Sequence, residues 1–590
     1  MRRLKTSLIV GLMGAMCGTA ASGQAVGYMS AEGNLNAAIA AKAPAGKAFK
    51  LQTPERMELK VASQAVKADA AKVQARRGVK AKATTSEGVA GYYVGTYLTL
   101  SSGSFDGGST MQITRDAEGD SVTVAAFWNG CPARAKYDTT TGTLSIPRQF
   151  MMTDANLGAL DLAVASQTGA PDYSAQLVGT VKADGTIDFG DAWYGIYVQA
   201  KGNNKDKFVG AYHDLQMRKP NGTMTYITSK NEQAGYYVNI DQTAPNMLTV
   251  SNIFNRGLKV EVELKRDRTA TISNQVAMKN SYGAWVLIAC KAFNDAGNLT
   301  SYSATITTDA AASDNNTVLR WTDWSLLCQE ASSYAGKLTD AVLTASKPFS
   351  YPELTVKEFE GEGTEANPYL IKSLDHLILL ADKVNTDEDL AYGSGTQAHT
   401  STYRGKYFAM ANDIDMQGYR FEPIGYSYSQ RFGGVFDGKG HSIKGLSVDA
   451  STKFYGGLFG MCDTTSVIKN VVLESPKVLS SYYSAGCLVG YTRGSVENIT
   501  VNNPALSGGT SGNGGVAGIV GGYMKNCHVK GGVVMGVGFL GGVAGEVHGG
   551  ATNCSAVGTN VYLTGTGTPG GGVLGNLLEG DGDQLWFSGL

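Results

Sequence analysis

The sequence predicts a mainly β protein, in which duplicated antiparallel β-domains, each a small barrel or sandwich, precede a solenoid of stacked strands. Three observations support this fold class. Two short phrases recur at a fixed period over the last third of the chain, as they do in stacked coils. The region before them carries one strand pattern twice. Charged residues are 17% of the chain and glycine is 76 of 590 residues, which suits an all-β or solenoid protein better than a helical one.

The first 25 residues have the features of a secretory signal peptide. A basic start, Met1 to Lys5, precedes a short apolar run from Ser7 to Ala21, and the small residues up to Ala25 offer a cleavage site. A membrane anchor is the alternative, but the run is short of the ~20 apolar residues that span a bilayer. Met16 before Cys17 is too bulky for the usual lipoprotein site. We therefore expect an exported protein, secreted or on the cell surface in association with the outer membrane, without a transmembrane helix.

Residues 26–88 are rich in Ala and Lys and show no sustained apolar face. This composition predicts a disordered, solvated linker. A long helical spacer is the alternative, and it would carry no chemistry either.

Residues 89–345 show the strand period of two, with Asn-Gly and Asp-Gly turn signals between the runs. We expect one β-domain at 89–232 and its copy at 233–345, and we assign no family to them. The copies match at three places: Gly91-Tyr92-Tyr93-Val94 with Gly235-Tyr236-Tyr237-Val238, Thr123 to Gln149 with Thr249 to Gln275 at a constant offset of 126, and Thr186 to Trp193 with Thr317 to Trp324 at an offset of 131. A duplication followed by one loop insertion produces a constant offset that changes at one place in the sequence.

The tryptophans at matching positions in the two copies, Trp193 and Trp324, have two interpretations. A ligand shelf could use them. Large aromatic side chains dominate β cores, so we expect core residues.

A Pro-containing linker at 346–360 leads into the solenoid region, 361–590. Ser373 can cap a helix whose apolar stripe runs from Leu374 to Val384. We expect this helix, at 373–385, to cover the first edge of the solenoid, because an open strand edge invites pairing with another chain.

The repeat itself consists of a Gly-Gly-apolar-x-Gly phrase and an apolar-x-Asn phrase. The asparagines are 28, 28 and 27 residues apart. Glycine permits sharp corners and positive φ, and a recurrent Asn suits an internal ladder of amides that bond to the coils above and below. The structural repeat residues are therefore expected to be Asn470, Asn498, Asn526 and Asn553, with the leading glycines Gly456, Gly486, Gly514, Gly541 and Gly571.

With these phrases, residues 361–590 resemble bacterial surface proteins with GLUG repeats. The resemblance includes a Gly-Thr-x-x-Asn-Pro-Tyr phrase ending at Tyr369, the Asp-Ile-Asp stretch at Asp413–Asp415 and the Phe-Asp-Gly-x-Gly-His turn ending at His441. It implies a right-handed parallel β-helix and an adhesin-like role at the surface. Some members of the family also carry a metallopeptidase domain of the immunoglobulin A1 protease type.

Seven cysteines remain after cleavage of the signal, and none has CxxC spacing, so neither a disulfide framework nor a zinc site is expected. Cys527 and Cys554 follow their asparagines directly and so fall at equivalent places in adjacent coils. A disulfide is conceivable there, but side chains in register point the same way. We expect stacked free thiols.

No catalytic motif stands out. None of the six histidines begins an HExxH motif, and neither a nucleophile elbow in a triad context nor a phosphate-binding loop is present. We predict no cofactor, no metal and no enzyme. If the chain were an enzyme, a carbohydrate-active β-helix would be the best case, with Asp413, Asp415 and Asp437 as candidate catalytic carboxylates. The structural interpretation is that these aspartates bond nearby backbone in turns.

We therefore expect an exported, non-catalytic protein that binds a host or matrix glycan or a protein through faces of the β-helix or the β-domains. A polysaccharide lyase or hydrolase and a purely structural surface component are the alternatives. The net charge of −1 argues against nucleic acid as a partner. The last coil has no helix to cover it, although Leu585 to Phe587 could fold back over it. We expect a truncated product that self-associates through this coil.

Overall fold

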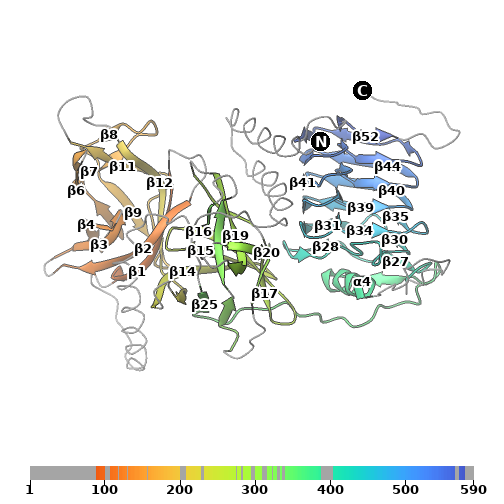
Figure 1. The fold of residues 1–590 in the computed structure, drawn as a ribbon, viewed down its shortest axis with the longest axis horizontal. Helices are drawn as coiled ribbons and strands as arrows, with labels where there is room; N and C mark the ends of the chain where they lie inside the picture. Colours follow the sequence, from red (N-terminus) through yellow and green to blue (C-terminus); the bar gives the residue numbers. More distant parts are fainter. Residues whose placement is uncertain are drawn as a thin grey trace. The chain divides into compact units, whose positions relative to one another are not determined.

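The computed structural model describes residues 88–99, 106–116, 119–128, 130–155, 157–199, 208–227, 232–273, 275–280, 283–293, 299–303, 305–308, 315–321, 323–328, 333–334, 339–386, 403–564 and 570–577. The predicted signal peptide, all but the last residue of the linker at 26–88 and the predicted plug at Leu585 to Phe587 lie outside these residues. The chain divides into two compact units, and one of them is the solenoid unit that runs on from Pro352 (Figure 1).

The other unit begins with a closed antiparallel barrel, so the barrel, one of the two predicted alternatives, is confirmed. Eight strands follow one another around it, and pairing of the first with the last closes the ring. The barrel strands are β1 (Gly91–Thr99), β2 (Asp106–Arg115), β3 (Ser121–Trp128), β4 (Cys131–Asp138), β5 (Thr143–Ile146), β9 (Leu177–Val181), β10 (Ile187–Asp188) and β12 (Phe208–Arg218). A side sheet extends from β12 through β11 (Trp193–Val198) and β7 (Gly158–Ala165) to β6 (Gln149–Asp154), and β8 (Pro171–Asp172) also pairs with β7.

A second barrel repeats this pairing strand for strand. Its order is β21-β17-β16-β15-β14-β13-β25-β22, and a bridge between Thr308 and Trp321 joins the two ends. The strands are β13 (Gly222–Ile227), β14 (Gln233–Ala244), β15 (Met247–Ile253), β16 (Leu258–Leu264), β17 (Ala270–Ser273), β21 (Thr305–Thr307), β22 (Val318–Trp321) and β25 (Thr339–Ala345). Its side sheet holds β18 (Val276–Asn280), β19 (Gly283–Phe293), β20 (Leu299–Ser303), β23 (Trp324–Cys328) and β24 (Ser333–Tyr334).

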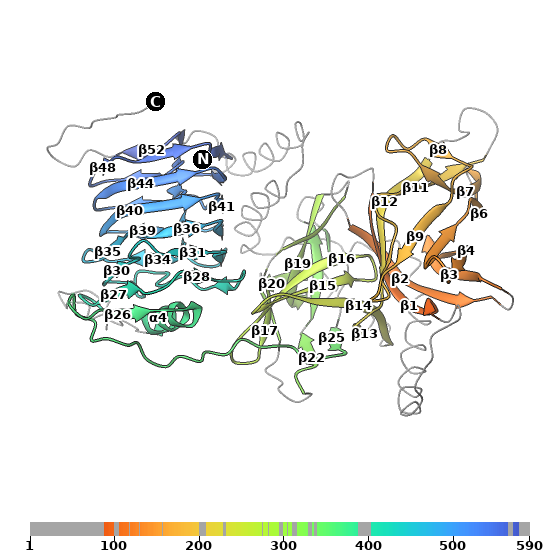
Figure 2. The same ribbon diagram turned by 180° about the vertical axis from the view of Figure 1, so that it is seen from behind.

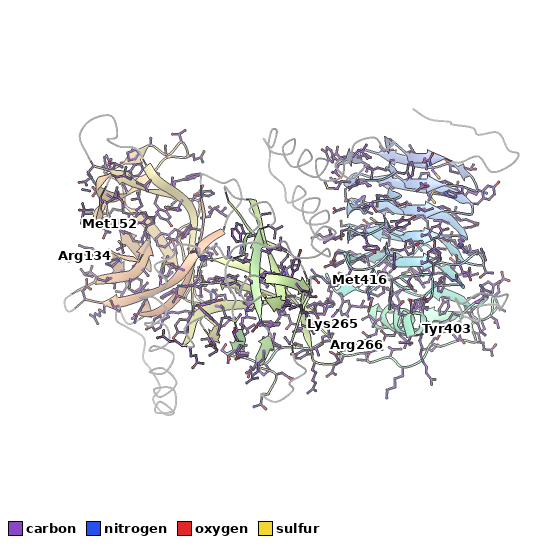
Figure 3. All side chains as sticks on the ribbon, in the orientation of Figure 1. Arg134, Met152, Lys265, Arg266, Tyr403 and Met416 are labelled. Atoms are coloured by element: carbon purple, nitrogen blue, oxygen red, sulfur yellow. The ribbon has the colours of Figure 1, made fainter. Side chains whose placement is uncertain are left out.

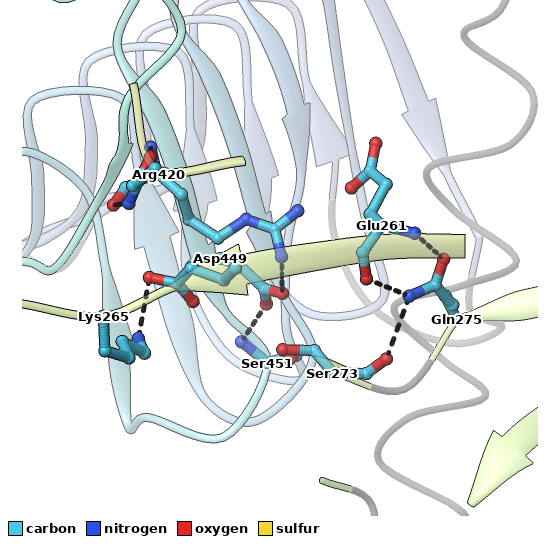
Figure 4. A network of polar contacts seen from close by, with 9 residues as sticks. Glu261, Lys265, Ser273, Gln275, Arg420, Asp449 and Ser451 are labelled. Atoms are coloured by element: carbon cyan, nitrogen blue, oxygen red, sulfur yellow. Dashed lines mark hydrogen bonds and ion pairs between the residues drawn. The ribbon is translucent and has the colours of Figure 1, made fainter. Parts of the chain in front are cut away.

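Matching hydrogen bonds support the predicted duplication. The Gln149 amide bridges to the backbone of Arg134 at 2.7 and 2.9 Å, and Gln275, 126 residues on, bridges to Glu261 at 2.9 and 3.0 Å. Arg134 is seen in Figure 3, and the bridge from Gln275 to Glu261 and Ser273 in Figure 4. Both glutamines hold the same turn, where the barrel passes into its side sheet.

Two details of the predicted duplication are wrong. The Gly-Tyr-Tyr-Val phrases do not correspond, because the first opens β1 whereas the second lies in β14, which takes the place of β2. The true counterpart of β1 is β13, which pairs with β14 and β25. The second domain therefore starts at Gly222 and not at 233. A tyrosine-rich strand start is common to several strands and does not fix the register by itself.

The matched tryptophans follow the core interpretation in the second copy. Trp324 is buried and packs on Phe254, with ring centroids 5.4 Å apart. Trp193 is half-buried and stacks on His213 at 4.1 Å.

The predicted linker at 346–360 has packed side chains. Phe349 is buried in the core of the second barrel, whereas Leu354 and Phe359 pack against the core of the solenoid. Large apolar side chains are stabilised by burial, and here they fix both ends of the junction.

The solenoid consists of stacked parallel strands in four sheets (Figures 1 and 2). The largest sheet holds β26 (Tyr369–Ile371), β27 (Tyr407–Met410), β28 (Ile414–Asp415), β30 (Val435–Asp437), β31 (Ser442–Lys444), β35 (Val467–Lys469), β36 (Val472–Glu474), β40 (Ser495–Asn502), β44 (Met524–Lys530), β48 (Ala551–Thr552) and β49 (Ser555–Val557). Beyond β26, each coil contributes two stretches to this sheet, and in the last four coils the repeated asparagine lies at the bend between them.

Each coil then continues through three shorter sheets. The second sheet contains β29 (Arg420–Phe421), β32 (Ser447–Ala450), β37 (Lys477–Ser480), β41 (Ala505–Ser507), β45 (Val533–Gly536) and β50 (Asn560–Leu563). The third contains β33 (Tyr455–Gly456), β38 (Ser484–Gly486), β42 (Asn513–Gly514), β46 (Leu540–Gly541) and β51 (Gly570–Gly571). The fourth contains β34 (Phe459–Cys462), β39 (Val489–Thr492), β43 (Ala517–Val520), β47 (Ala544–Val547) and β52 (Leu574–Leu577).

The predicted capping helix is confirmed as α4 (Leu374–Thr386). Its apolar face, including Leu377, Leu380 and Val384, is buried in the same core as the first coils. The side chain of Asn385 bonds Pro423 and Gly425 at 3.0 and 2.8 Å and so fastens the helix end to the loop of the first coil. Figure 1 shows α4 at the end of the stack, next to β27.

Candidate functional site

The repeated asparagines form a ladder of side-chain amides along the solenoid. Each amide nitrogen donates to the amide oxygen of the coil before it, at 3.0, 2.8 and 2.7 Å for Asn498, Asn526 and Asn553. Asn470 starts the ladder by donating to the Asp437 carboxylate at 2.8 Å. The amide bonds are as predicted, but the ladder is not internal, because these side chains are half-buried or exposed.

The asparagines also serve the backbone. All four have φ between 52° and 56°, the left-handed region that Asn tolerates better than most residues. At Asn470 and Asn553 this bend separates two strands, whereas Asn498 and Asn526 bend the continuous strands β40 and β44. Asparagine therefore meets two requirements at these positions. It tolerates the left-handed backbone conformation, and its side-chain amide bonds the neighbouring coil.

The leading glycines are needed for space and not for positive φ. A Cβ on Gly514 would lie 2.4 Å from the Ala517 carbonyl oxygen and 2.5 Å from the Ala544 Cα, and one on Gly541 would lie 2.0 Å from the Ala544 carbonyl oxygen. Among the described residues with positive φ, none of the five leading glycines occurs. The predicted positive φ is thus wrong for them. Close backbone approach requires glycine at Gly486, Gly514, Gly541 and Gly571, whereas Gly456 is enclosed by the side chains of Ala450 and Ser480.

Cys527 and Cys554 hold free thiols on neighbouring coils. The Cys527 thiol donates to the carbonyl oxygens of Val496 and Lys525, at 3.7 and 3.4 Å. A hydrogen bond between the two thiols raises the pKa of Cys527 and lowers that of Cys554. They stack as predicted.

Asp413 and Asp415 hold turns of the first coils together. The Asp413 carboxylate accepts from the Ser442 amide at 2.8 Å and contacts His441 Nδ1 at 3.1 Å. These partners lower its pKa, the Ser442 amide most. Asp415 accepts from the Gln417 amide at 2.9 Å. A carboxyl that donates a proton near neutral pH needs a raised pKa, and Asp413 has the opposite shift.

Asp437 is the most buried of the three candidate carboxylates. Burial opposes its charge, but hydrogen bonds from Asn470, from the Lys439 amide and from the Lys439 ammonium outweigh it and lower the pKa. Asp437 therefore acts as an anchor for the amide ladder. The part of the chain that the structure describes has no cluster of three His, Cys, Asp or Glu side chains suited to hold a metal.

Further polar pairs join successive coils. Arg420 of β29 lies 3.6 Å from Asp449 of β32, and Asp449 also accepts from the Ser451 amide at 3.1 Å (Figure 4). His528 shares a 2.8 Å hydrogen bond with Ser555 on the next coil. These contacts stabilise the stack.

The solenoid carries a group of aromatic side chains that the packing of its core does not explain. They lie on three successive coils, around the corner between the sheet of β32 and β37 and the sheet of β33 and β38. We call this group the aromatic corner: Tyr428, Phe454, Tyr455, Tyr482, Tyr483 and Tyr491. Four of the eleven large apolar side chains that are exposed among the described residues belong to it.

The aromatic corner is built around the buried ring of Tyr455. This ring contacts Tyr428, Tyr483 and Tyr491, at centroid distances of 6.0, 5.8 and 5.5 Å. Phe454 and Tyr482, which occupy the same place in adjacent coils, are 4.9 Å apart and perpendicular. Tyr428, Phe454, Tyr482 and Tyr483 remain 40–48% exposed. Aromatic rings that are held in place yet left open to solvent are typical of binding surfaces.

Arginines adjoin the aromatic corner. The Arg493 guanidinium lies 5.7 Å from the Tyr428 ring and bonds the side chain of Tyr491. On the coil before it, the buried carboxylate of Asp463 is paired with Arg404 and is attracted by Arg431 as well as by Arg493. Three guanidinium groups thus interact electrostatically with one carboxylate, so the surplus charge is positive.

Sequence reasoning missed the aromatic corner, although a signal was present. The pairs Phe454-Tyr455 and Tyr482-Tyr483 are 28 residues apart, which is the repeat period. Aromatic pairs in register with the repeat, at a turn that otherwise carries small polar residues, predict a stack of rings on one surface.

No family model matches the chain, and no solved structure matches it. Halomucin of Haloquadratum walsbyi is 32% identical over 174 residues, which are 28% of this chain and 2% of halomucin. A putative Gly-rich membrane protein of Evansella cellulosilytica is 28% identical over 149 residues, which are 24% of this chain and 15% of that protein. The chain therefore spans only a small part of either relative. Within its described residues, no helix combines the length and apolarity needed to cross a lipid bilayer.

Proposed function

We propose that this chain is an exported, adhesin-like surface protein that binds a glycan without catalysis, and that its solenoid belongs to the GLUG-repeat class. The observation that carries the binding proposal is the aromatic corner, with four exposed rings held on a rigid stack. The partial likeness to a halomucin and to a putative membrane protein agrees with a place at the cell surface.

A sugar fits the exposed rings for two reasons. The C–H groups on one face of a pyranose carry partial positive charge, and they pack against the electron-rich face of an aromatic ring. Tyrosine hydroxyls and the Arg493 guanidinium can meet the sugar hydroxyls at the rim. Coils are about 4.8 Å apart, close to the length of one sugar in an extended polysaccharide. A chain along the solenoid axis would meet Phe454 and Tyr482 in turn.

The test is incubation of the full-length protein with a panel of polysaccharides, with and without calcium. We expect retarded migration in affinity electrophoresis and no release of oligosaccharides. Reproducible product release would contradict the non-catalytic part and favour a lyase or hydrolase. In that case, alanine substitutions at Asp413, Asp415 and Asp437 should abolish release.

A further inference from the structure

We propose that the ligand of the aromatic corner is an acidic polysaccharide, and that Arg493 recognises its carboxylate or sulfate groups. This inference rests on the proposed glycan binding and adds the chemical class of the glycan. It is carried by the juxtaposition of exposed aromatic rings with an exposed guanidinium, that of Arg493, which forms no ion pair with a carboxylate of the described residues.

The positive surplus next to the rings comes from the stacking of the coils. Arg431, Asp463 and Arg493 lie at one corner in three successive coils, as the backbone bonds from Asp463 to Phe432 at 2.8 Å and from Arg493 to Cys462 at 3.2 Å require. The carboxylate of Asp463 is already engaged by Arg404 and by the Thr464 amide, at 2.8 Å for the amide. Asp463 therefore balances one cation and leaves the others in excess.

Arg493 is the member of this set that a ligand can reach. It is exposed, whereas Arg431 is buried and Arg404 is paired with Asp463. Among the ion pairs between described residues, none involves Arg493. Its guanidinium is instead held over Tyr428 and against Tyr491, so its direction is fixed. A fixed guanidinium binds a carboxylate or sulfate through two parallel hydrogen bonds.

The nearest other cation supports a sparsely charged ligand. Lys453 adjoins Phe454, but its ammonium already pairs with Glu422 at 2.8 Å and lies over the Tyr426 ring at 4.0 Å. One available guanidinium beside several rings suits a polysaccharide with spaced anionic groups. A nucleic acid carries a charge on every nucleotide and is bound by a series of cations, so it fits less well.

The experiment compares polygalacturonate with its fully methyl-esterified form, since the two share a backbone and differ in charge. Binding of the full-length protein is measured by isothermal calorimetry at low salt. We expect the acid form to bind at least about tenfold more tightly than the ester, as loss of one charged hydrogen-bonded pair implies. Dextran sulfate, which carries sulfate groups and no carboxylates, compared with uncharged dextran, forms a second arm that separates sulfate from carboxylate recognition. Binding to the acidic forms should weaken as salt rises.

Arg493→Gln is the matched variant. It should lower affinity for the acidic form about tenfold and leave affinity for the ester unchanged, whereas Arg493→Lys should retain part of the preference. Lys525→Gln removes an exposed charge from another strand, β44, and should change neither affinity.

The remaining outcomes contradict either the acidic ligand or the proposed glycan binding. Equal binding of the acid and ester forms, or unchanged acid binding in Arg493→Gln with normal circular dichroism, would contradict the acidic ligand and leave the proposed glycan binding intact. Tighter binding of oligo-dT than of any polysaccharide would also overturn the inference. Failure to bind every glycan in either form would instead contradict the proposed function.

Discussion

At the scale of single residues, the solenoid is governed by close backbone approach and by a shared bend. The buried fraction of a side chain reveals neither the close backbone approach nor the bend. The leading glycines Gly486, Gly514 and Gly541 lie against backbone atoms of the next coil. The repeated asparagine bends the chain where its amide meets a neighbour. Both requirements recur with the coil, which is why both residues recur in the sequence.

Gly514→Ala should destabilise the solenoid by about 3 kcal/mol or more, because the new methyl group would collide with backbone atoms that cannot move aside. Gly572→Ala is the control, since a Cβ there meets nothing within 4 Å. Its effect should stay within about 0.5 kcal/mol. Calorimetric unfolding of the full chain measures both, and equal effects of the two substitutions would refute the steric explanation.

Asn498→Ala and Asn498→Gly separate the two roles of the ladder residue. The alanine variant loses the amide bonds and the tolerance of positive φ, and we expect a cost of about 2–3 kcal/mol. The glycine variant keeps the bend and should cost about 1 kcal/mol. Native-state hydrogen exchange of the adjacent coils measures the difference. Identical protection in the two variants would show that the bend has no energetic role.

Asp437 should make the start of the ladder sensitive to acid. Its pKa is lowered in the folded state, so the stability that it contributes is present above the unfolded pKa of about 3.9 and is lost as the pH falls through the folded value. We expect lower protection factors, measured against the intrinsic exchange rate at the same pH, at the Lys439 backbone amide and the Asn470 side-chain amide below about pH 4. In Asp437→Asn the protection should be lower at neutral pH and nearly independent of pH. An unchanged acid transition in that variant would assign the effect to another group.

At the scale of elements, the capping helix α4 and the coils share one core. Leu380 is fully buried in that core, and β26 under the helix is the first strand of its sheet. The helix thereby protects a strand edge that would otherwise pair with another chain.

Leu380→Asp should release the helix and promote self-association of the full-length protein, because a buried charge without a partner is strongly unfavourable. Lys383→Ser, at an exposed position of the same helix, serves as the control. Multi-angle light scattering over a range of concentrations measures the molar mass. A monomeric Leu380→Asp protein with an ordered solenoid would show that the helix is not needed as a cap.

The elements that could be predicted are those whose signal is local or periodic. The helix follows from its apolar stripe, and the coils follow from the spacing of Asn470 to Asn553. The register of the duplicated barrels could not be read from Gly91-Tyr92-Tyr93-Val94, because the pairing of β1 with β12 joins strands more than 100 residues apart. The aromatic corner was missed because its rings come from three coils and meet only after stacking.

At the scale of the whole molecule, the chain joins two copies of one barrel to a capped solenoid. The equivalent strand orders show that the pairing pattern was kept while individual residues changed, as Trp128 and Phe254 do at matching positions. The barrels have filled interiors lined by buried side chains such as Met111 and Val260. The exposed aromatic surface is instead on the solenoid, which is why we place recognition there.

The most direct test of a glycan-binding site at the aromatic corner uses the Phe454→Ala/Tyr482→Ala double variant. Its affinity is measured for a glycan that the unsubstituted protein binds. These side chains are exposed, so the fold should survive, and loss of two stacking surfaces should weaken binding by at least about tenfold. Tyr562→Ala, at a more exposed tyrosine on β50, should leave the affinity unchanged. Affinity that is retained in the double variant, or lost equally in Tyr562→Ala, would contradict a binding site at the aromatic corner.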